Sequence, residues 1–164
     1  MVVSRLVPYK KIDLIVKVFN QLGWKLKIAG VGNQMSSFKK IAKRNIEFLG
    51  KVSDNNLSVL YQNCQALIIA ADEDFGITAL EVQAAGRPVI ALKKGGALDT
   101  IIEGKTGIFF KSQTVIDLKL ALSKFKRLKF KPSDCRSNAE KFSKNIFIKK
   151  FKKFTEDKWQ KHQK

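Results

Sequence analysis

The sequence predicts an α/β fold, a Rossmann-like doubly wound parallel sheet of about six strands with helices on both faces. Short apolar runs alternate along the chain with stretches of helical periodicity. Residues 66–70 are all apolar, as in a central parallel strand that is buried on both faces. A chain of 164 residues with 45% hydrophobic residues is long enough for one well-buried domain.

Three strand–helix units are predicted in the first half of the chain. The strands are expected at residues 1–4, 24–29 and 46–49. The helices are expected at residues 11–22, in the stretch that ends near Arg44, and around Leu57–Tyr61. Gly23 is expected to end the first of these helices, and Ser53 or Asp54 to cap the third.

Three more strands are predicted at residues 66–70, 88–92 and 107–110. The helices between and after them are expected at residues 77–85, 98–103 and 114–122. Gly86 is expected to end the first of these, and Thr114 with Asp117 forms a capping-box start for the last.

Polar and glycine residues follow the predicted strands at their carboxyl ends. Arg5, Gly30, Gly50, Glu73 and Gly95 follow the first five strands in order. Ligands of doubly wound sheets bind beyond the carboxyl ends of the strands. The periodicity alone therefore predicts one shared cleft at this edge of the sheet.

The segment from Glu73 to Glu81 carries the most specific pattern. Two glutamates eight positions apart can face one cleft only if the chain reverses between them, and Phe75-Gly76 lies where such a reversal is expected. A helix that begins there directs free backbone N–H groups at the cleft, which suits a phosphate. Two carboxylates that accept from hydroxyl groups, beside such a helix end, indicate a nucleotide-sugar site. The alternative is an ordinary acidic helix N-terminus.

This segment resembles the E-x7-E motif of retaining glycosyltransferases with the GT-B architecture, in particular glycosyltransferase family 4. Four further segments resemble that family in the same order, and together they span roughly residues 1–110. They are Val3–Asp13, Leu26–Asn33, Asn45–Asp54 and Gly95–Asp99. The stretch from Asp74 to Ala91 is most similar to bacterial mannosyltransferases of surface-polysaccharide synthesis.

The resemblance implies catalytic roles for Glu73, Arg5 and Lys10. Glu73 would hold a hydroxyl of the donor sugar and position its anomeric carbon. Arg5 and Lys10 would neutralise the leaving diphosphate. Lys11 stands where the family usually has Gly, so either lysine could contact the diphosphate.

The remaining donor-binding residues also follow from the resemblance. Glu81 would accept hydrogen bonds from the ribose hydroxyls, and Gly50, Lys51 and Val52 would line the base pocket. Backbone groups of one segment would cradle the sugar and diphosphate: Phe75, Gly76, Ile77 and Thr78. Glycine loops are expected to lie close to the ligand: Gly30 with Gly32, and Gly95 with Gly96. Val31, Asn33 and Asp99 depart from the family's usual residues.

No cofactor or metal is expected besides the nucleoside diphosphate sugar, which is the substrate. Asp72-Glu73-Asp74 mimics the DxD metal motif of another glycosyltransferase architecture and is interpreted as coincidental. Cys64 and Cys135 lack metal-ligand spacing and are expected to be thiols in a reducing cytoplasm. His162, near the C-terminus, is expected to be a solvated tail residue.

Residues 1–145 are predicted to form the nucleotide-sugar-binding domain and residues 146–164 a basic amphipathic helix. An apolar stripe of this region comprises Phe142, Ile146, Phe147, Phe151 and Phe154. Packing on this domain or on a partner domain is favoured over a helix that lies on a membrane. In the proteins that the chain resembles, the final helix crosses back to the other domain.

The resemblance covers only the C-terminal, donor-binding half of a GT-B enzyme. An N-terminal acceptor domain is therefore expected to be absent or to be a partner subunit, and the chain alone is expected to bind donor without efficient transfer. The chain could be a fragment of a longer enzyme, one subunit of a split enzyme or the product of a decayed gene, and the sequence leaves all three open.

The net charge of +18 leaves a second kind of function open. A non-catalytic basic module could bind nucleic acid or an anionic membrane on the same fold. Nucleic acid is the less expected partner, because no aromatic–basic interleaving occurs in the first hundred residues. The expected location is cytoplasmic, with peripheral attachment to the inner membrane face as an option. No leader is expected, since Arg5 and Pro8 interrupt the apolar start.

Overall fold

Six short parallel strands form the centre of the fold, which a computed structural model describes for residues 1–163. They are β1 (Val2–Val3), β2 (Leu26–Ala29), β3 (Ile46–Gly50), β4 (Leu67–Ile69), β5 (Val89–Leu92) and β6 (Gly107–Phe110). Every ladder between neighbouring strands is parallel. The predicted strand positions are confirmed, with ends that differ by at most two residues.

The strands form two three-stranded sheets where the sequence predicted one sheet of about six strands. The orders are β1-β2-β3 and β4-β5-β6. Two hydrogen bonds join them: the Ile68 N–H donates to the Met1 carbonyl at 2.9 Å, and the Met1 ammonium donates to the Ala66 carbonyl at 2.7 Å. Because β1 has only two residues, it is too short to extend a full ladder to β4. The spatial order is still that of a doubly wound fold.

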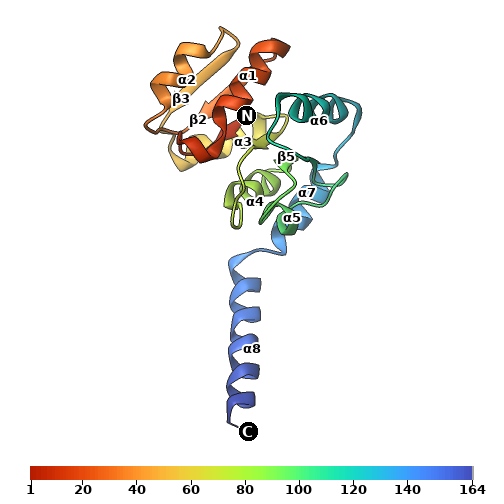
Figure 1. Ribbon diagram of the computed structural model, residues 1–164. Helices are drawn as coiled ribbons and strands as arrows, with labels where there is room; N and C mark the ends of the chain where they lie inside the picture. The colour runs from red at the N-terminus through yellow and green to blue at the C-terminus, as the bar shows by residue number, and fades with distance from the viewer. Residues whose placement is uncertain (164) are drawn as a thin grey trace.

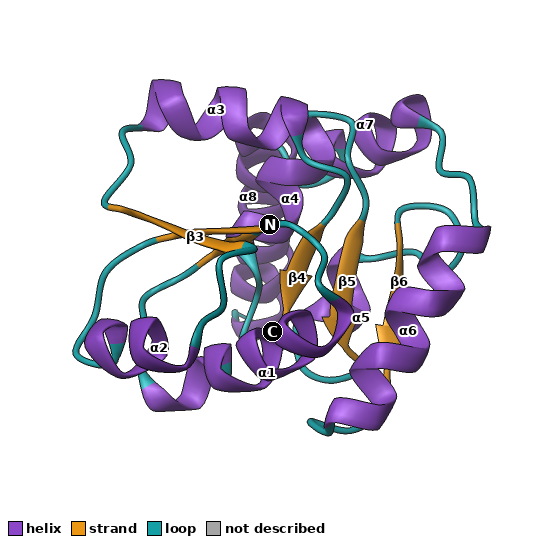
Figure 2. Ribbon diagram, turned by 90° about the horizontal axis from the view of Figure 1, so that it is seen from above, coloured by secondary structure: helices purple, strands orange, loops and turns teal. Residues whose placement is uncertain are grey.

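Helices cover both faces of the strands, as predicted (Figure 2). The helices of the described chain are α1 (Ile12–Leu22), α2 (Met35–Ile41), α3 (Asp54–Asn63), α4 (Ile77–Ala84), α5 (Ala97–Thr100), α6 (Val115–Arg127), α7 (Pro132–Glu140) and α8 (Lys144–His162), with a 3₁₀ turn η1 (Pro8–Lys10). Helices α1, α2 and α6 lie on one face, and α3, α4 and α7 on the other (Figure 2). Helix α7 was not predicted from the sequence, although Pro132 stands at the helix start, where proline is favoured.

Side chains of β4 show why the run at residues 66–70 is apolar. Ile68 packs in one core cluster, with α1 and α6, and Leu67 and Ile69 pack in the other, with Val82 of α4. Successive side chains of a strand point to opposite faces. A strand covered on both faces must therefore be apolar at every position.

Local signals set several helix ends as expected. Gly23 ends α1 with φ of 68°, and its N–H donates to the Phe19 carbonyl at 2.9 Å. Ser53, and not Asp54, is the cap of α3. Thr114 caps α6 by accepting from the Asp117 N–H at 3.2 Å, and α6 continues to Arg127, five residues beyond the predicted Leu122.

Helix α8 leaves the domain and extends away from it (Figure 1). It begins at Lys144, slightly before the predicted boundary, and none of its described residues is buried. Its exposed apolar side chains include Phe147, Phe151, Phe154 and Trp159. Packing of this helix on its own domain, one of the two favoured options, is therefore wrong; packing on a partner stays a prediction.

Candidate functional site

An ion pair joins two of the predicted catalytic residues. The Lys10 ammonium donates to both carboxylate oxygens of Glu73 at 2.6 Å. Lys10 ends the turn that follows β1, and Glu73 lies in the loop between β4 and α4. Their side chains are 14% and 23% exposed. With Ser4 and Thr78 they line a cavity of about 10 Å³. Two segments far apart in the sequence thus meet at the carboxyl edge of the strands, as predicted.

Lys11, the neighbouring lysine, has a different environment. It is exposed, with φ of 54° and ψ of 36°, and is the one non-glycine residue with positive φ among residues 1–163. It connects η1 to α1. This left-handed conformation favours glycine and is unfavourable for a lysine.

Arg5 lies at the same edge and is exposed. Its guanidinium donates to the Tyr9 hydroxyl at 2.7 Å, and the Lys10 ammonium lies 4.9 Å from the centroid of the Tyr9 ring. Tyr9 thus contacts both predicted diphosphate-binding cations. Tyr9 was given no role from the sequence, although its position between Arg5 and Lys10 was a usable signal.

Gly76 marks the reversal that the sequence predicted between the two glutamates. Its φ is 83°, and it precedes the first residue of α4. The Phe75 and Ile77 side chains are exposed, at 47% and 64%. The first backbone N–H groups of α4 have no intrahelical acceptor, so the helix start can offer donors to an anion.

Glu81, on α4, is held by a residue that the sequence analysis missed. The Tyr61 hydroxyl, on α3, donates to Glu81 Oε2 at 2.8 Å. Tyr61 is buried, whereas Glu81 is exposed. Burial and the adjacent carboxylate raise the pKa of Tyr61 well above its usual range. The phenol therefore stays protonated and donates to Glu81. This bond orients the Glu81 carboxylate through Oε2, and Oε1 has no bond to Tyr61.

The predicted glycine loops contact other loops of the edge. The Gly96 N–H donates to the Glu73 carbonyl at 2.7 Å, and a Cβ on Gly95 or Gly96 would overlap the backbone of residues 73–75. A Cβ on Gly30 or Gly32 would overlap the backbone of Ser4 or Leu6. The close approach that these glycines permit is thus between loops; contact with a ligand stays a prediction.

Three residues predicted to line a base pocket follow β3. Gly50 has φ of 68°, and its carbonyl accepts from the Gly30 N–H at 2.7 Å. Lys51 is exposed and Val52 is half-buried. The structure therefore brings this loop next to the Gly30 loop and leaves Lys51 accessible.

A buried amide network lies behind α4. Gln83 donates to the carbonyls of Ala79 and Thr100 at 3.0 and 2.9 Å. Asn138 of α7 donates to Gln83 Oε1 at 2.8 Å, and the Thr100 hydroxyl donates to the Gly96 carbonyl at 2.9 Å. These bonds connect α4, α5 and α7. The available sequence signal was Gln83, a long polar residue between the apolar Val82 and Ala84 of α4.

Phe142 connects the start of α8 to the site. Its ring lies edge-on to that of Phe75, with centroids 6.0 Å apart. Phe75 belongs to the loop that carries Glu73. The segment that leads into α8 therefore packs on the candidate donor loop.

Acidic residues near the site form ion pairs. Asp72 lies 2.9 Å from the Lys94 ammonium, and Glu73 is bound by Lys10. Within residues 1–163, no group of three or more His, Cys, Asp and Glu side chains could hold a metal ion. In the same part of the chain, no helix is long and apolar enough to cross a membrane.

Solved structures show what this fold is similar to. The lipopolysaccharide outer core galactosyltransferase WaaB superposes with a TM-score of 0.84 at 22% identity, over 96% of this chain and 48% of that protein. Anabaena HepE, solved with UDP and glucose, gives a TM-score of 0.75 at 19% identity, over 96% and 48% of the two chains. At such identities the likeness concerns the fold, which is that of GT-B glycosyltransferases.

Curated relatives share sequence with part of the chain. A GDP-mannose-dependent phosphatidylinositol monomannoside mannosyltransferase of Mycobacterium tuberculosis is 32% identical over 130 residues, 68% of this chain and 34% of that protein. The α-1,3/1,6-mannosyltransferase ALG2 of Dictyostelium discoideum is 40% identical over 83 residues, 50% and 20% of the two chains. The chain spans about a third or less of the length of these two relatives.

The family described as "Glycosyl transferases group 1" matches residues 1–142. This match includes every predicted site residue, from Arg5 to Gly96. The chain therefore belongs to the group 1 glycosyltransferase family.

Proposed function

We propose that this chain is the donor-binding half of a retaining, metal-independent glycosyltransferase. It would serve the transfer of a hexose from a nucleoside diphosphate sugar to a glycan or lipid-linked acceptor. The observation that carries the proposal is the Lys10–Glu73 pair at the carboxyl edge of the strands, beside the start of α4. A cation, a carboxylate and free helix N–H groups are the partners that a diphosphate and a sugar hydroxyl require.

In the proposed reaction, the bond between the anomeric carbon and the diphosphate oxygen breaks as the acceptor oxygen bonds to that carbon, and the proton of the acceptor hydroxyl passes to the leaving diphosphate. Lys10 and Arg5 would stabilise the negative charge that develops on the leaving diphosphate. Glu73 would then accept from a sugar hydroxyl and hold the anomeric carbon in place. Glu81, oriented by Tyr61 at 2.8 Å, would accept from the ribose hydroxyls.

GDP-mannose is the first donor to test. The relative from Mycobacterium tuberculosis and one from Corynebacterium glutamicum, 33% identical over 121 residues, are named GDP-mannose-dependent mannosyltransferases. Structural neighbours were solved with UDP, and the pneumococcal O-GlcNAc transferase GtfA was solved with UDP and GlcNAc. The base and the sugar are therefore the first variables of the experiment.

Efficient transfer would need a second half that supplies the acceptor site. The chain spans 48% of WaaB and of HepE, and α8 exposes an apolar face with Phe147, Phe151 and Phe154. We propose that a separate acceptor domain or partner subunit covers this face. The cytoplasm, with peripheral attachment to the inner membrane face, is the proposed location.

Calorimetric titration of the purified chain with GDP, UDP, ADP and their sugar forms tests the proposal. A preference for one base, weakened about ten- to a hundredfold by Glu81→Ala, supports a donor site; this corresponds to about 1.4–2.8 kcal/mol. Glu47→Ala is the matched control, since Glu47 is exposed on β3 and pairs with Lys27 at 3.7 Å. Absence of binding to every nucleotide would contradict the proposal.

The second candidate is a non-catalytic basic module for nucleic acid or an anionic membrane. Helix α8 favours this candidate, because exposed lysines and the exposed aromatic residues Phe151 and Trp159 alternate along it. Salt distinguishes the two candidates. Binding to duplex DNA through Z phosphates weakens with a log–log slope of about −0.9Z, whereas a nucleotide held by Glu81 and backbone groups depends less on salt.

A further inference from the structure

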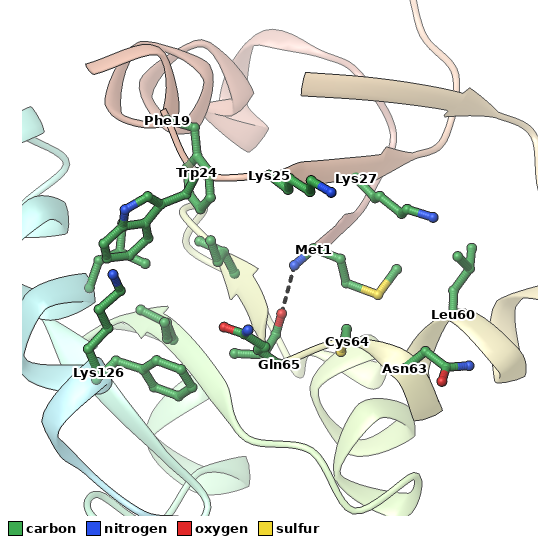
Figure 3. A pocket seen from close by; sticks show the side chains of 15 residues that line it. Met1, Phe19, Trp24, Lys25, Lys27, Leu60, Asn63, Cys64, Gln65 and Lys126 are labelled. Carbon is green, nitrogen blue, oxygen red and sulfur yellow. Dashed lines mark hydrogen bonds between the residues drawn. The ribbon is translucent and has the colours of Figure 1, made fainter. Parts of the chain in front are cut away.

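A cavity of about 530 Å³ opens at the edge of the strands opposite to Lys10 and Glu73. Its residues come from the amino ends of β1, β2 and β4 and from the ends of α1, α3 and α6 (Figure 3). This volume is typical of small-molecule sites, which are mostly apolar with a few polar groups. The cavity lies where the two sheets meet, beside the bond from the Met1 ammonium to the Ala66 carbonyl.

The wall of the cavity is apolar and largely rigid. Phe19, Ile68, Ile90 and Leu122 line it and are buried in the main core. Phe125 and Leu60 add half-buried apolar surface. Side chains packed in a core sit in rotamer minima and have little free volume in which to move. The cavity is therefore a preformed feature that an apolar group could fill.

The mouth of the cavity carries positive charge. Lys25, Lys27 and Lys126 line it, and none of the lining residues is acidic. Lys27 lies 3.7 Å from Glu47, whereas neither Lys25 nor Lys126 forms an ion pair within residues 1–163. The Lys126 ammonium is 3.7 Å from the centroid of the Trp24 ring, which holds it beside the cavity (Figure 3).

We infer that this cavity binds an amphipathic anion, a single apolar chain that ends in a carboxylate or phosphate. The apolar wall would take up the chain, while Lys126 and Lys25 would meet the anionic group. A nucleotide fits less well, because Lys126 already covers the Trp24 ring. Charge complementarity also excludes a cationic amphiphile. Nothing in this inference depends on the donor site, which lies at the other edge.

Tryptophan fluorescence of the full chain can test this inference. Trp159 of α8 is 62% exposed, so Trp159→Phe leaves Trp24 as the reporter at the cavity. The probes are decyl phosphate, decanoate, decanol and decyltrimethylammonium, each used below its micelle concentration. We expect saturable changes with decyl phosphate and decanoate, and at least tenfold weaker binding of decanol and the cation.

Lys126→Gln, compared with Lys105→Gln, isolates the role of the charge. Both variants lose one positive charge, but the exposed Lys105 lies in the loop before β6, away from the cavity. We expect Lys126→Gln to weaken decyl phosphate about tenfold, the scale of one charged hydrogen bond. Decanol binding should change less than twofold, and Lys105→Gln should leave both affinities unchanged.

A second readout uses the half-buried Cys64, which lines the cavity, whereas Cys135 is fully buried elsewhere. Bound decyl phosphate should slow labelling of Cys64 by a thiol reagent, followed by mass spectrometry. Equal affinity for decanol and decyl phosphate, equal effects of the two lysine variants, or unprotected Cys64 at saturation would each overturn the inference. Weak, non-saturable fluorescence changes with every amphiphile would also overturn it.

Discussion

The Lys10 ammonium is bound to both carboxylate oxygens of Glu73 at 2.6 Å, although the two residues are 63 positions apart. Without a donor, each of these groups neutralises the other. A diphosphate that bound to Lys10, as proposed, would share or break this pair and would release Glu73 for a sugar hydroxyl. Engagement of the diphosphate and of the sugar would in this way be coupled.

The first prediction concerns the two adjacent lysines. Lys10→Gln should weaken binding of the preferred nucleoside diphosphate about ten- to a hundredfold, because it would remove the proposed charged partner of the diphosphate. Lys11→Gln should weaken it less than threefold, since Lys11 is exposed and has no described role at the edge. Calorimetry on both variants measures the difference. A larger loss for Lys11→Gln would reverse the assignment.

The second prediction concerns the hydrogen bond from Tyr61 to Glu81. Tyr61→Phe should weaken binding of the ribonucleotide roughly three- to tenfold, the scale of one hydrogen bond. The loss should nearly vanish for a 2′,3′-dideoxy analogue, which offers Glu81 no ribose hydroxyl. Titrations of the two proteins with the two ligands form a double-mutant cycle. An equal loss of affinity for both ligands would mean that Tyr61 contributes only through packing.

The third prediction concerns Gly96, whose added Cβ would overlap the backbone of Asp74 and Phe75. Gly96→Ala should displace the loop that carries Glu73, lower the free energy of unfolding by about 1–3 kcal/mol and reduce nucleotide affinity at least tenfold. Gly104→Ala is the control, because Gly104 has φ of 79° and open space at its Cβ position. It should lose stability through backbone strain while nucleotide affinity is retained. Equal affinities for the two variants would contradict the loop contact.

The fourth prediction concerns the stability of the fold at alkaline pH. Burial raises the pKa of the Cys135 thiol from 9.0 to about 11. Because the unfolded chain loses this proton first, Cys135 contributes a stability that is complete below pH 9 and is lost as the pH rises to about 11. Two pKa units correspond to about 2.7 kcal/mol at most.

Denaturant unfolding of the wild type and Cys135→Ala between pH 8 and 11.5, a range that brackets the raised pKa of Cys135, can check this. The variant should be less stable at pH 8, through lost packing, and the difference should shrink at higher pH. The comparison cancels the titration of the lysines, which both proteins share. A constant difference would show that Cys135 does not titrate with folding.

The fifth prediction concerns α8, which has no buried residue among those described. A chain that ends at Ser143 should keep its melting temperature within about 2 °C, since removal of an exposed helix takes away little buried surface. It retains Phe142, which packs on Phe75. Calorimetric melting of both chains tests this. A large drop would mean that α8 folds back onto the domain in solution.

The sequence by itself determined the features that depend on neighbouring residues. The apolar run at 66–70 requires a strand covered on both faces, and β4 is such a strand. Gly23, Ser53 and Thr114 act within one turn of their own helix ends. The motif from Glu73 to Glu81 indicated a site because its reversal at Gly76 is also local.

The tertiary structure alone decided what depends on distant residues. It selected Lys10 over Lys11 as the partner of Glu73, placed Tyr61 under Glu81, and separated the strands into two sheets at the short β1. It also showed that α8 stands away from the domain (Figure 1). Such pairings join residues that no periodicity relates. They form only when the packed strands and helices bring the carboxyl ends of β1 and β4 together, because the geometry of packing and not the spacing along the chain sets those distances.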